Sequence, residues 1–86
     1  MALLLKLLKL HGVLALTAES RTTHYNRINN GTMVPPVRLG ENSVAWPEHE
    51  IQAVNAARIA GKSDEEIRQL VTKLVADRQA ANGVAT

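Results

Sequence analysis

The chain has 86 residues and a formal net charge of +2, and it contains no cysteine and no phenylalanine. A chain of this length forms one small domain without room for a large active-site cavity. The lack of cysteine excludes disulfides, a thiolate nucleophile and sulfur-based zinc sites, and it fits a reducing cytoplasm. The core must come from leucine, isoleucine, valine and alanine, which suits helices.

The charge is unevenly distributed along the chain. Residues 1–46 carry five lysines and arginines against two acidic residues, whereas residues 47–86 carry five against six. No acidic residue lies between Glu19 and Glu41, but Arg21, Arg27 and Arg38 do. A local basic field of this kind favours a polyanionic partner, although an ordinary solvated surface can give the same pattern.

The leucine-rich start, MALLLKLLKL, is too short for a membrane span and is interrupted by two lysines. It also lacks the basic start and the cleavage site of a signal peptide, and a short helix on a lipid surface is an alternative. The preferred interpretation is a partly ordered lead-in over residues 1–6, followed by three leucines that enter the core: Leu7, Leu8 and Leu10.

Two short helices are expected next. The first spans residues 10–17, where apolar residues repeat at helical spacing: Leu10, Val13 and Leu14, with Leu16 on the flank. After a tight connection, Ser20 can cap a second helix by accepting a hydrogen bond from an amide two or three residues later, and Gly31 can end it. Two short helices joined by about three residues have the spacing of a helix-turn-helix.

Residues 33–46 predict a two-stranded hairpin. Pro35 and Pro36 exclude helix, and the turn chemistry of Gly40-Glu41-Asn42 separates two stretches in which apolar residues alternate. So small a hairpin is marginal by itself and must pack on the helices, with Trp46 as its anchor.

A third helix is expected to have Pro47 at its first position and to end at Gly61. Its buried side is predicted to consist of Ile51, Val54, Ala57 and, less centrally, Ile59.

The fourth helix is predicted from a capping box, in which Ser63 and Glu66 each bond the other's amide. Its apolar stripe should run to about Gln79, with fraying from Ala80 onward: Ile67, Leu70, Val71, Leu74 and Val75. Such a stripe is more often core than partner surface, and self-association through it is a minority hypothesis.

Enzymatic interpretations find little support. The three histidines, His11, His24 and His49, have no metal-ligand spacing, and there is no phosphate-binding glycine loop, nucleophile elbow or metalloprotease helix. We therefore expect no catalysis, no metal, no cofactor and no small-molecule substrate.

The ordered set of motifs within residues 8–62 resembles the AlpA family of phage and prophage regulators, which are related to excisionase and MerR-type domains. The likeness rests on LKLHGVLALTAESRTTHYNRINNGTMVPPVRLGENSVAWPEHEI, with a Ser-Arg opening of the recognition helix, a proline pair, a basic-Leu-Gly hairpin and an Ala-Trp pair before the next helix. It implies a mainly α fold with a small β-hairpin: a winged helix-turn-helix over residues 7–62, a C-terminal amphipathic helix over residues 63–80 and a tail over residues 81–86.

The sequence departs from the family's pattern at four positions. Ala18 and Glu19 stand where a glycine and an apolar residue are common, and His24 and Arg27 stand where isoleucine and leucine are common. Helical periodicity alone would bury Tyr25 with Ile28. The resemblance instead buries His24 with Ile28 and leaves Tyr25 at the rim, and we follow the resemblance.

The resemblance and the charge together predict that the partner is double-stranded DNA, bound by a monomer or by self-associated copies. Arg21, Thr22 and Asn26 are the candidate base-reading residues, because arginine can pair with guanine and asparagine with adenine. Tyr25, Arg27 and the amides at the start of the second helix are assigned to phosphates, and Arg38 and Asn42 to a wing. The full set of candidate DNA-binding residues is Ser20, Arg21, Thr22, Thr23, Tyr25, Asn26, Arg27, Asn30, Arg38 and Asn42.

The predicted function is a cytoplasmic, sequence-specific, DNA-binding transcriptional regulator of a prophage or integrated element. One alternative is an excisionase that bends DNA at attachment sites. Another, of a different class, is a protein-interaction module that uses the stripe of the fourth helix.

Overall fold

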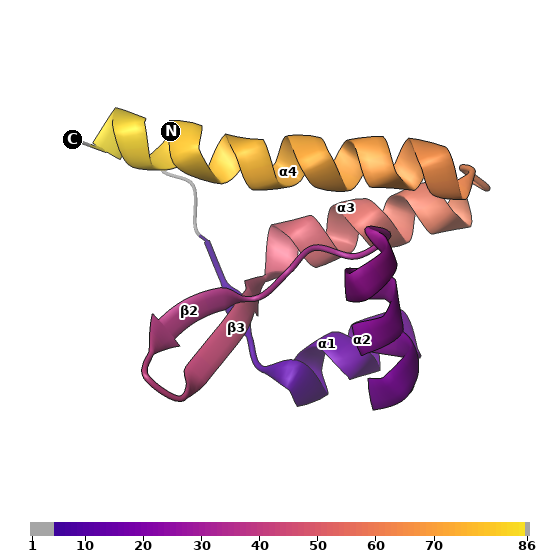
Figure 1. Cartoon of the computed structure of the whole chain (residues 1–86), viewed down its shortest axis with the longest axis horizontal. Coiled ribbons are helices and arrows are strands. Elements are labelled where there is room, and N and C mark those ends of the chain that lie inside the picture. The colour runs from indigo at the N-terminus through magenta and orange to yellow at the C-terminus, as the bar shows by residue number, and fades with distance from the viewer. Residues whose placement is uncertain (1–4, 86) are drawn as a thin grey trace.

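The computed structural model of the chain describes residues 5–85, with side chains as far as Gln79. The elements are β1 (Leu7–Leu8), α1 (Leu10–Thr17), α2 (Arg21–Asn30), β2 (Val37–Gly40), β3 (Ser43–Pro47), α3 (Glu48–Ile59) and α4 (Asp64–Ala85). The expected fold class, a mainly helical winged helix-turn-helix with a small hairpin, is confirmed. In Figure 1, α4 lies along one edge of the molecule beside α3, and α1, α2 and the β2–β3 hairpin form the opposite end.

The turn between α1 and α2 contains a residue in the left-handed conformation. Ala18 has φ 59° and ψ 28°, and its amide donates to the carbonyl oxygen of Leu14 at 2.9 Å. A residue with a Cβ atom adopts this conformation at a cost of about 1–2 kcal/mol, which a glycine avoids. The turn of a helix-turn-helix therefore forms here without the usual glycine.

Both ends of α2 form as the sequence predicts. The Ser20 side chain accepts a hydrogen bond from the amide of Thr23 at 3.2 Å. At the other end Gly31 has φ 86°, and the amides of Gly31 and Thr32 donate to the carbonyls of Ile28 and Arg27 at 3.2 and 2.9 Å. This pair of bonds is a Schellman motif, which satisfies the last carbonyls of the helix.

The expected two-stranded hairpin is part of a three-stranded antiparallel sheet with strand order β1-β3-β2. On one side of β3, Leu7 pairs with Pro47 and Leu8 with Trp46, and on the other side Arg38 pairs with Val44. The register shifts between Arg38 and Gly40, as at a β-bulge. A strand of two residues is held by backbone pairing and leaves no alternation in the sequence, so the third strand could not be predicted.

The added strand corrects two predictions about its neighbourhood. Leu7 was expected in the core but is 47% exposed, because successive residues of a strand point to opposite faces and Leu8 takes the inner one. Pro47 is the last residue of β3 and the N-cap of α3, with extended backbone (φ −63°, ψ 126°), rather than the first helical residue.

The core is centred on Trp46, whose side chain is fully buried and donates from Nε1 to the carbonyl oxygen of Val34 at 3.2 Å. Ile51 and Val54 of α3 pack on it with no exposure, as predicted. Ile59, however, is 87% exposed. Five residues after Val54, it lies roughly 140° around the helix and so faces solvent.

Helix α4 starts with the predicted capping box. The amide of Ser63 donates to Glu66 Oε1 at 3.0 Å, and the amide of Glu66 donates to Ser63 Oγ at 3.2 Å. These bonds to Ser63 lower the pKa of the Glu66 carboxyl. The helix continues to Ala85, beyond the point where fraying was expected, and Thr86 lies outside the described residues.

The apolar stripe of α4 is used inside the molecule. Ile67 and Val71 are buried in the core, and three further members pack against it with partial burial: Leu70, Leu74 and Val75. Near its end, Arg78 forms an ion pair with the buried Glu50 of α3 and donates from Nη2 to the carbonyl oxygen of Pro35 at 2.8 Å. Helix α4 is thus joined both to α3 and to the segment that leads into the hairpin.

Candidate nucleic-acid interface

Helix α2 is held down by one face and presents the other to solvent. His24 is fully buried and Ile28 is partly buried against the core, whereas Tyr25 is 38% exposed. The predicted arrangement, with His24 inward and Tyr25 at the rim, is confirmed. The exposed side chains of the helix are Arg21, Thr22, Tyr25, Asn26, Asn29 and Asn30.

His24 fixes α2 directly to the sheet. Its imidazole lies edge-on to the Trp46 ring, with ring centroids 5.0 Å apart, and edge-on to the Tyr25 ring at 5.3 Å. Neither ring nitrogen has a hydrogen-bond partner among the described residues. Burial lowers the pKa of His24, and the nearby Glu19 carboxylate offsets this only in part. The neutral imidazole therefore packs as a flat apolar group between helix and strand.

Three predicted base-reading residues keep their polar groups free. Arg21, Thr22 and Asn26 are exposed, and within the described part of the chain no hydrogen bond or ion pair engages their side chains. All three lie within the first six residues of α2. A ligand can therefore recruit these groups without breaking a contact of the fold.

Other candidates of α2 already have partners. The Ser20 hydroxyl donates to Thr23 Oγ1 at 3.0 Å, so these two side chains complete the N-cap. Asn30 Oδ1 accepts from the amide and the hydroxyl of Thr32, at 3.1 and 2.6 Å, and this holds the turn after the helix.

Arg27 differs most from its expected environment. Its guanidinium forms an ion pair with Glu19 through Nε, and both side chains are largely shielded from solvent. The two residues are eight apart, with Glu19 in the turn before α2 and Arg27 on the helix, and no periodicity in the sequence predicts this contact. Arg27 therefore keeps only its terminal N–H groups for another partner.

The hairpin places the two wing candidates on its exposed part. Arg38 lies on β2 opposite Val44, and Asn42 lies in the turn next to Glu41. One further cation lies at this sheet and was not predicted: Lys9, just after β1, donates from Nζ to Ser43 Oγ at 2.7 Å. Its only sign in the sequence is a lysine inside the leucine-rich start.

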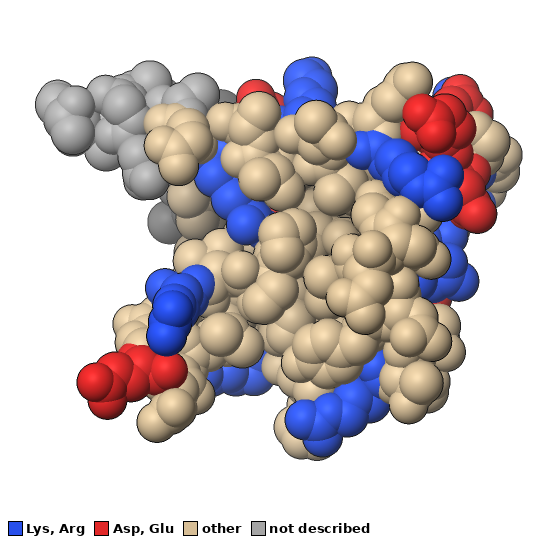
Figure 2. All heavy atoms as spheres, in the orientation of Figure 1, with Lys and Arg blue, Asp and Glu red and all other residues tan. Residues whose placement is uncertain are grey.

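The surface charge follows this arrangement. Figure 2 shows basic atoms over the hairpin and along the end formed by the helix-turn-helix, with acidic atoms at the hairpin turn. Acidic and basic atoms are mixed at the other end, where α3 is joined to α4. The acidic residues there include the first turn of α4: Asp64, Glu65 and Glu66.

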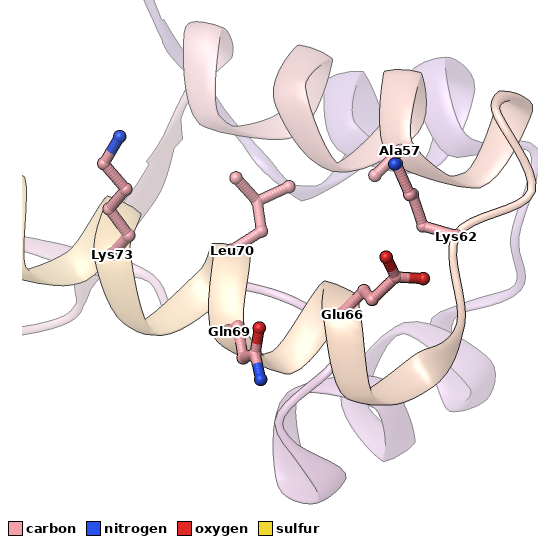
Figure 3. A pocket seen from close by; sticks show the side chains of 6 residues that line it. All are labelled: Ala57, Lys62, Glu66, Gln69, Leu70 and Lys73. Atoms are coloured by element: carbon pink, nitrogen blue, oxygen red, sulfur yellow. The ribbon is translucent and has the colours of Figure 1, made fainter.

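The surface has hollows beside α4. One of about 370 Å³ lies between α3 and α4, with Leu70 directed at the gap and Lys62 and Glu66 at its end (Figure 3). Glu66 is already used by the capping box. Among the described residues, no three histidine or acidic side chains are grouped so that they could bind a metal ion.

No helix within residues 5–85 has both the length and the apolar character that crossing a bilayer requires. Comparison with known proteins gives the family. The family model described as prophage CP4-57 regulatory protein (AlpA) matches residues 6–59. The chain belongs to the AlpA family. The expected resemblance is thus confirmed, and the AlpA match runs from just before β1 to the last residue of α3.

The AlpA-family chain also has a relative in Enterobacteria phage P4, described as uncharacterized protein ORF88. The two are 40% identical over 57 residues, which is 66% of this chain and 65% of the phage protein. The chain therefore spans slightly less than two thirds of that relative. No solved structure matches the chain significantly.

Proposed function

We propose that this AlpA-family protein is a sequence-specific DNA-binding regulator of transcription in a prophage or integrated element. Helix α2 acts as the recognition helix and the β2–β3 hairpin as the wing. One observation carries the proposal: the exposed polar face of α2, with Arg21, Thr22 and Asn26 free of partners, on a helix fixed to the sheet through His24 and Trp46.

The chemistry of this face suits the edges of base pairs. An arginine pairs with guanine and an asparagine with adenine through two hydrogen bonds in the major groove, each pair contributing about 1–3 kcal/mol of discrimination. Recognition helices place their N-terminal residues on the bases. We assign base contacts to Arg21, Thr22 and Asn26.

Phosphate contacts fall around this face. Tyr25 is at the rim of α2, Ser20 and Thr23 frame its first amides, and Arg38 and Asn42 extend along the hairpin. Arg27 reaches a phosphate through its terminal N–H groups while Nε stays on Glu19. Such contacts set position and affinity and carry no sequence information.

Occupancy of a short site then blocks or recruits polymerase, and the protein needs no catalytic group for this. An excisionase would use the same contacts at attachment-site DNA. The stripe of α4 gives less support to a protein-interaction module, because its residues pack in the core.

The first test is affinity against salt, for a duplex selected from a random pool and measured by fluorescence anisotropy. The logarithm of the association constant should fall by about 0.9 per log unit of salt for each phosphate neutralised. A flat dependence, or no binding to any duplex at low salt, would contradict DNA binding. An in vitro excision assay with the cognate integrase separates the regulator from the excisionase.

Variants of α2 and of the hairpin test the assignment of roles. Asn26→Ala should lose about 1–3 kcal/mol of preference at one base pair, whereas Arg38→Ala should weaken binding to all sequences alike. Lys73→Ala, on the exposed side of α4, serves as the control for lost charge. Equal weakening on all duplexes by Asn26→Ala would remove its role in base recognition.

A further inference from the structure

A lysine outside the predicted interface is attached to the hairpin. Lys9 follows β1 and precedes α1, and its Nζ donates to Ser43 Oγ at 2.7 Å and to the carbonyl oxygen of Val44 at 3.4 Å. Ser43 and Val44 are the first two residues of β3. A residue from the start of the chain thus reaches the part of the hairpin next to its turn.

The sheet order puts this lysine opposite a basic residue of the hairpin. Strand β3 lies in the middle, with β1 on one side and β2 on the other. Lys9 approaches β3 from the β1 side, and Arg38 pairs with Val44 from the β2 side. The wing therefore carries one cation along each edge, about two strand spacings or roughly 10 Å apart at the backbone.

The Lys9 ammonium still has capacity for a ligand. It has three N–H donors, of which Ser43 and Val44 take two, and its side chain is exposed. It forms no ion pair with an acidic group among the described residues. A hydroxyl partner orients the lysine and carries no charge, whereas the partner of Arg27 is the Glu19 carboxylate, which offsets part of the guanidinium charge.

We propose that Lys9 is a DNA-phosphate ligand of the wing, oriented by Ser43, and that Lys9 and Arg38 hold the phosphates on the two sides of the groove entered by the hairpin. The minor groove is about 6 Å wide between its rims, so two cations about 10 Å apart at the backbone can each reach one rim. This inference rests on the proposed function, because it assigns a phosphate contact to the same interface.

The test uses the full-length protein and the duplex selected by the wild type. Lys9→Met keeps the aliphatic stem and removes the charge, so it should weaken binding and lower the salt slope by about 0.9, the value for one phosphate. Lys9→Arg should keep the wild-type slope. The matched control is Lys6→Met, which removes a cation three residues away that pairs with Glu48 at 3.7 Å, and it should leave the slope unchanged.

If the contact between Lys9 and Ser43 only positions the wing, a different result is expected. In that case Ser43→Ala would weaken binding as much as Lys9→Met, and neither would change the slope. We expect Ser43→Ala to weaken binding less than Lys9→Met and to keep the slope. An unchanged slope in Lys9→Met would overturn the proposal while leaving DNA binding by the wild type intact.

A scan with methylphosphonates, which remove the charge of one phosphate at a time, gives a second measurement, made with the wild type and with both variants. One substitution on each side of the groove should weaken the wild type. One of these two substitutions should not weaken binding by Lys9→Met any further, and the other should not weaken binding by Arg38→Ala any further. If every neutralised phosphate weakens Lys9→Met as much as it weakens the wild type, Lys9 contacts none of them.

Discussion

His24 shows how one residue can anchor helix α2 to the core while making the stability of the fold depend on pH. The imidazole is fully buried between Tyr25 and Trp46, and neither nitrogen has a hydrogen-bond partner among the described residues. A protonated ring in this place would be a charge without a compensating contact. Burial accordingly lowers the pKa of His24 in the folded protein.

The free energy of unfolding should therefore fall as the pH is lowered through the range of an ordinary histidine. Above about pH 6.5 both the folded and the unfolded chain hold a neutral His24. Below this pH the unfolded chain binds a proton at His24, whereas the folded chain does not. The free energy of unfolding therefore falls by up to about 1.4 kcal/mol per pH unit until the pH reaches the pKa of His24 in the folded protein. Urea unfolding at pH 7, 6 and 5 measures this loss.

The control for this prediction is a pair of variants. His24→Leu fills the same apolar site and should remove that part of the pH dependence, whereas His49→Gln, at an exposed position, should keep it. If His24→Leu loses stability toward pH 5 as steeply as the wild type, the proton binds elsewhere.

Single residues also mark where prediction from the sequence fails. Capping residues such as Ser20 and Ser63 were predicted because their partners lie three residues away on the same turn. The pairs Arg27–Glu19 and Lys9–Ser43 join residues 8 and 34 positions apart, and only the folded chain brings them together. The exposed residues of α2 could therefore be predicted from the sequence. The contacts that Arg27 and Lys9 make with residues of other segments could not.

At the level of elements, the glycine that ends α2 has a role that can be measured. Gly31 has φ +86°, and an added Cβ would meet the Arg68 side chain only at ordinary contact distance, 3.5 Å. The cost of a side chain there comes from the backbone. We expect Gly31→Ala to lower the free energy of unfolding by about 1–2 kcal/mol.

Substitutions at two other glycines distinguish the cost of backbone strain from the cost of steric crowding. Gly61 has φ +80° and open space around its Cβ position, so Gly61→Ala should cost a similar amount. Gly40 also has open space but is not left-handed, so Gly40→Ala should change the stability by less than about 1 kcal/mol. Equal effects of all three substitutions in urea unfolding would contradict the argument.

Elements with a strong local signal were predicted well. The two helices over residues 10–30, the hairpin and the capped α4 each have a period, a cap or a turn motif in the sequence. Strand β1 has two residues and no pattern, so no strand was predicted there, and both of its leucines were expected in the core. Ile59 was predicted on the buried side of α3, although its position five residues after Val54 turns it to solvent.

For the whole molecule, the question is whether α4 belongs to the same folding unit as the winged helix-turn-helix, because the family match ends at residue 59. The ion pair between Glu50 of α3 and Arg78 of α4 indicates that it does. Glu50 is 1% exposed, and Arg78 contacts both of its oxygens, through Nε at 2.9 Å and Nη2 at 2.6 Å. Arg78 also donates to the carbonyl of Pro35, just before the hairpin.

Arg78→Ala should therefore destabilise the entire chain. The substitution leaves the buried Glu50 carboxylate without its partner, and breaking a buried pair in this way costs about 3–5 kcal/mol. If α4 and the domain form one unit, urea unfolding followed by Trp46 fluorescence and by far-ultraviolet circular dichroism should shift together. Lys73→Ala, on the exposed side of α4, should change the stability by less than about 0.5 kcal/mol.

A double variant distinguishes the loss of the partner from the loss of the helix contact. Replacing both charges, as Glu50→Met with Arg78→Met, removes the unpaired carboxylate and should restore most of the stability, since apolar replacements of buried pairs are often neutral or stabilising. If the double variant is as unstable as Arg78→Ala, the lost stability comes from the bond to Pro35. If Arg78→Ala shifts only the circular dichroism, α4 unfolds independently of the domain around Trp46.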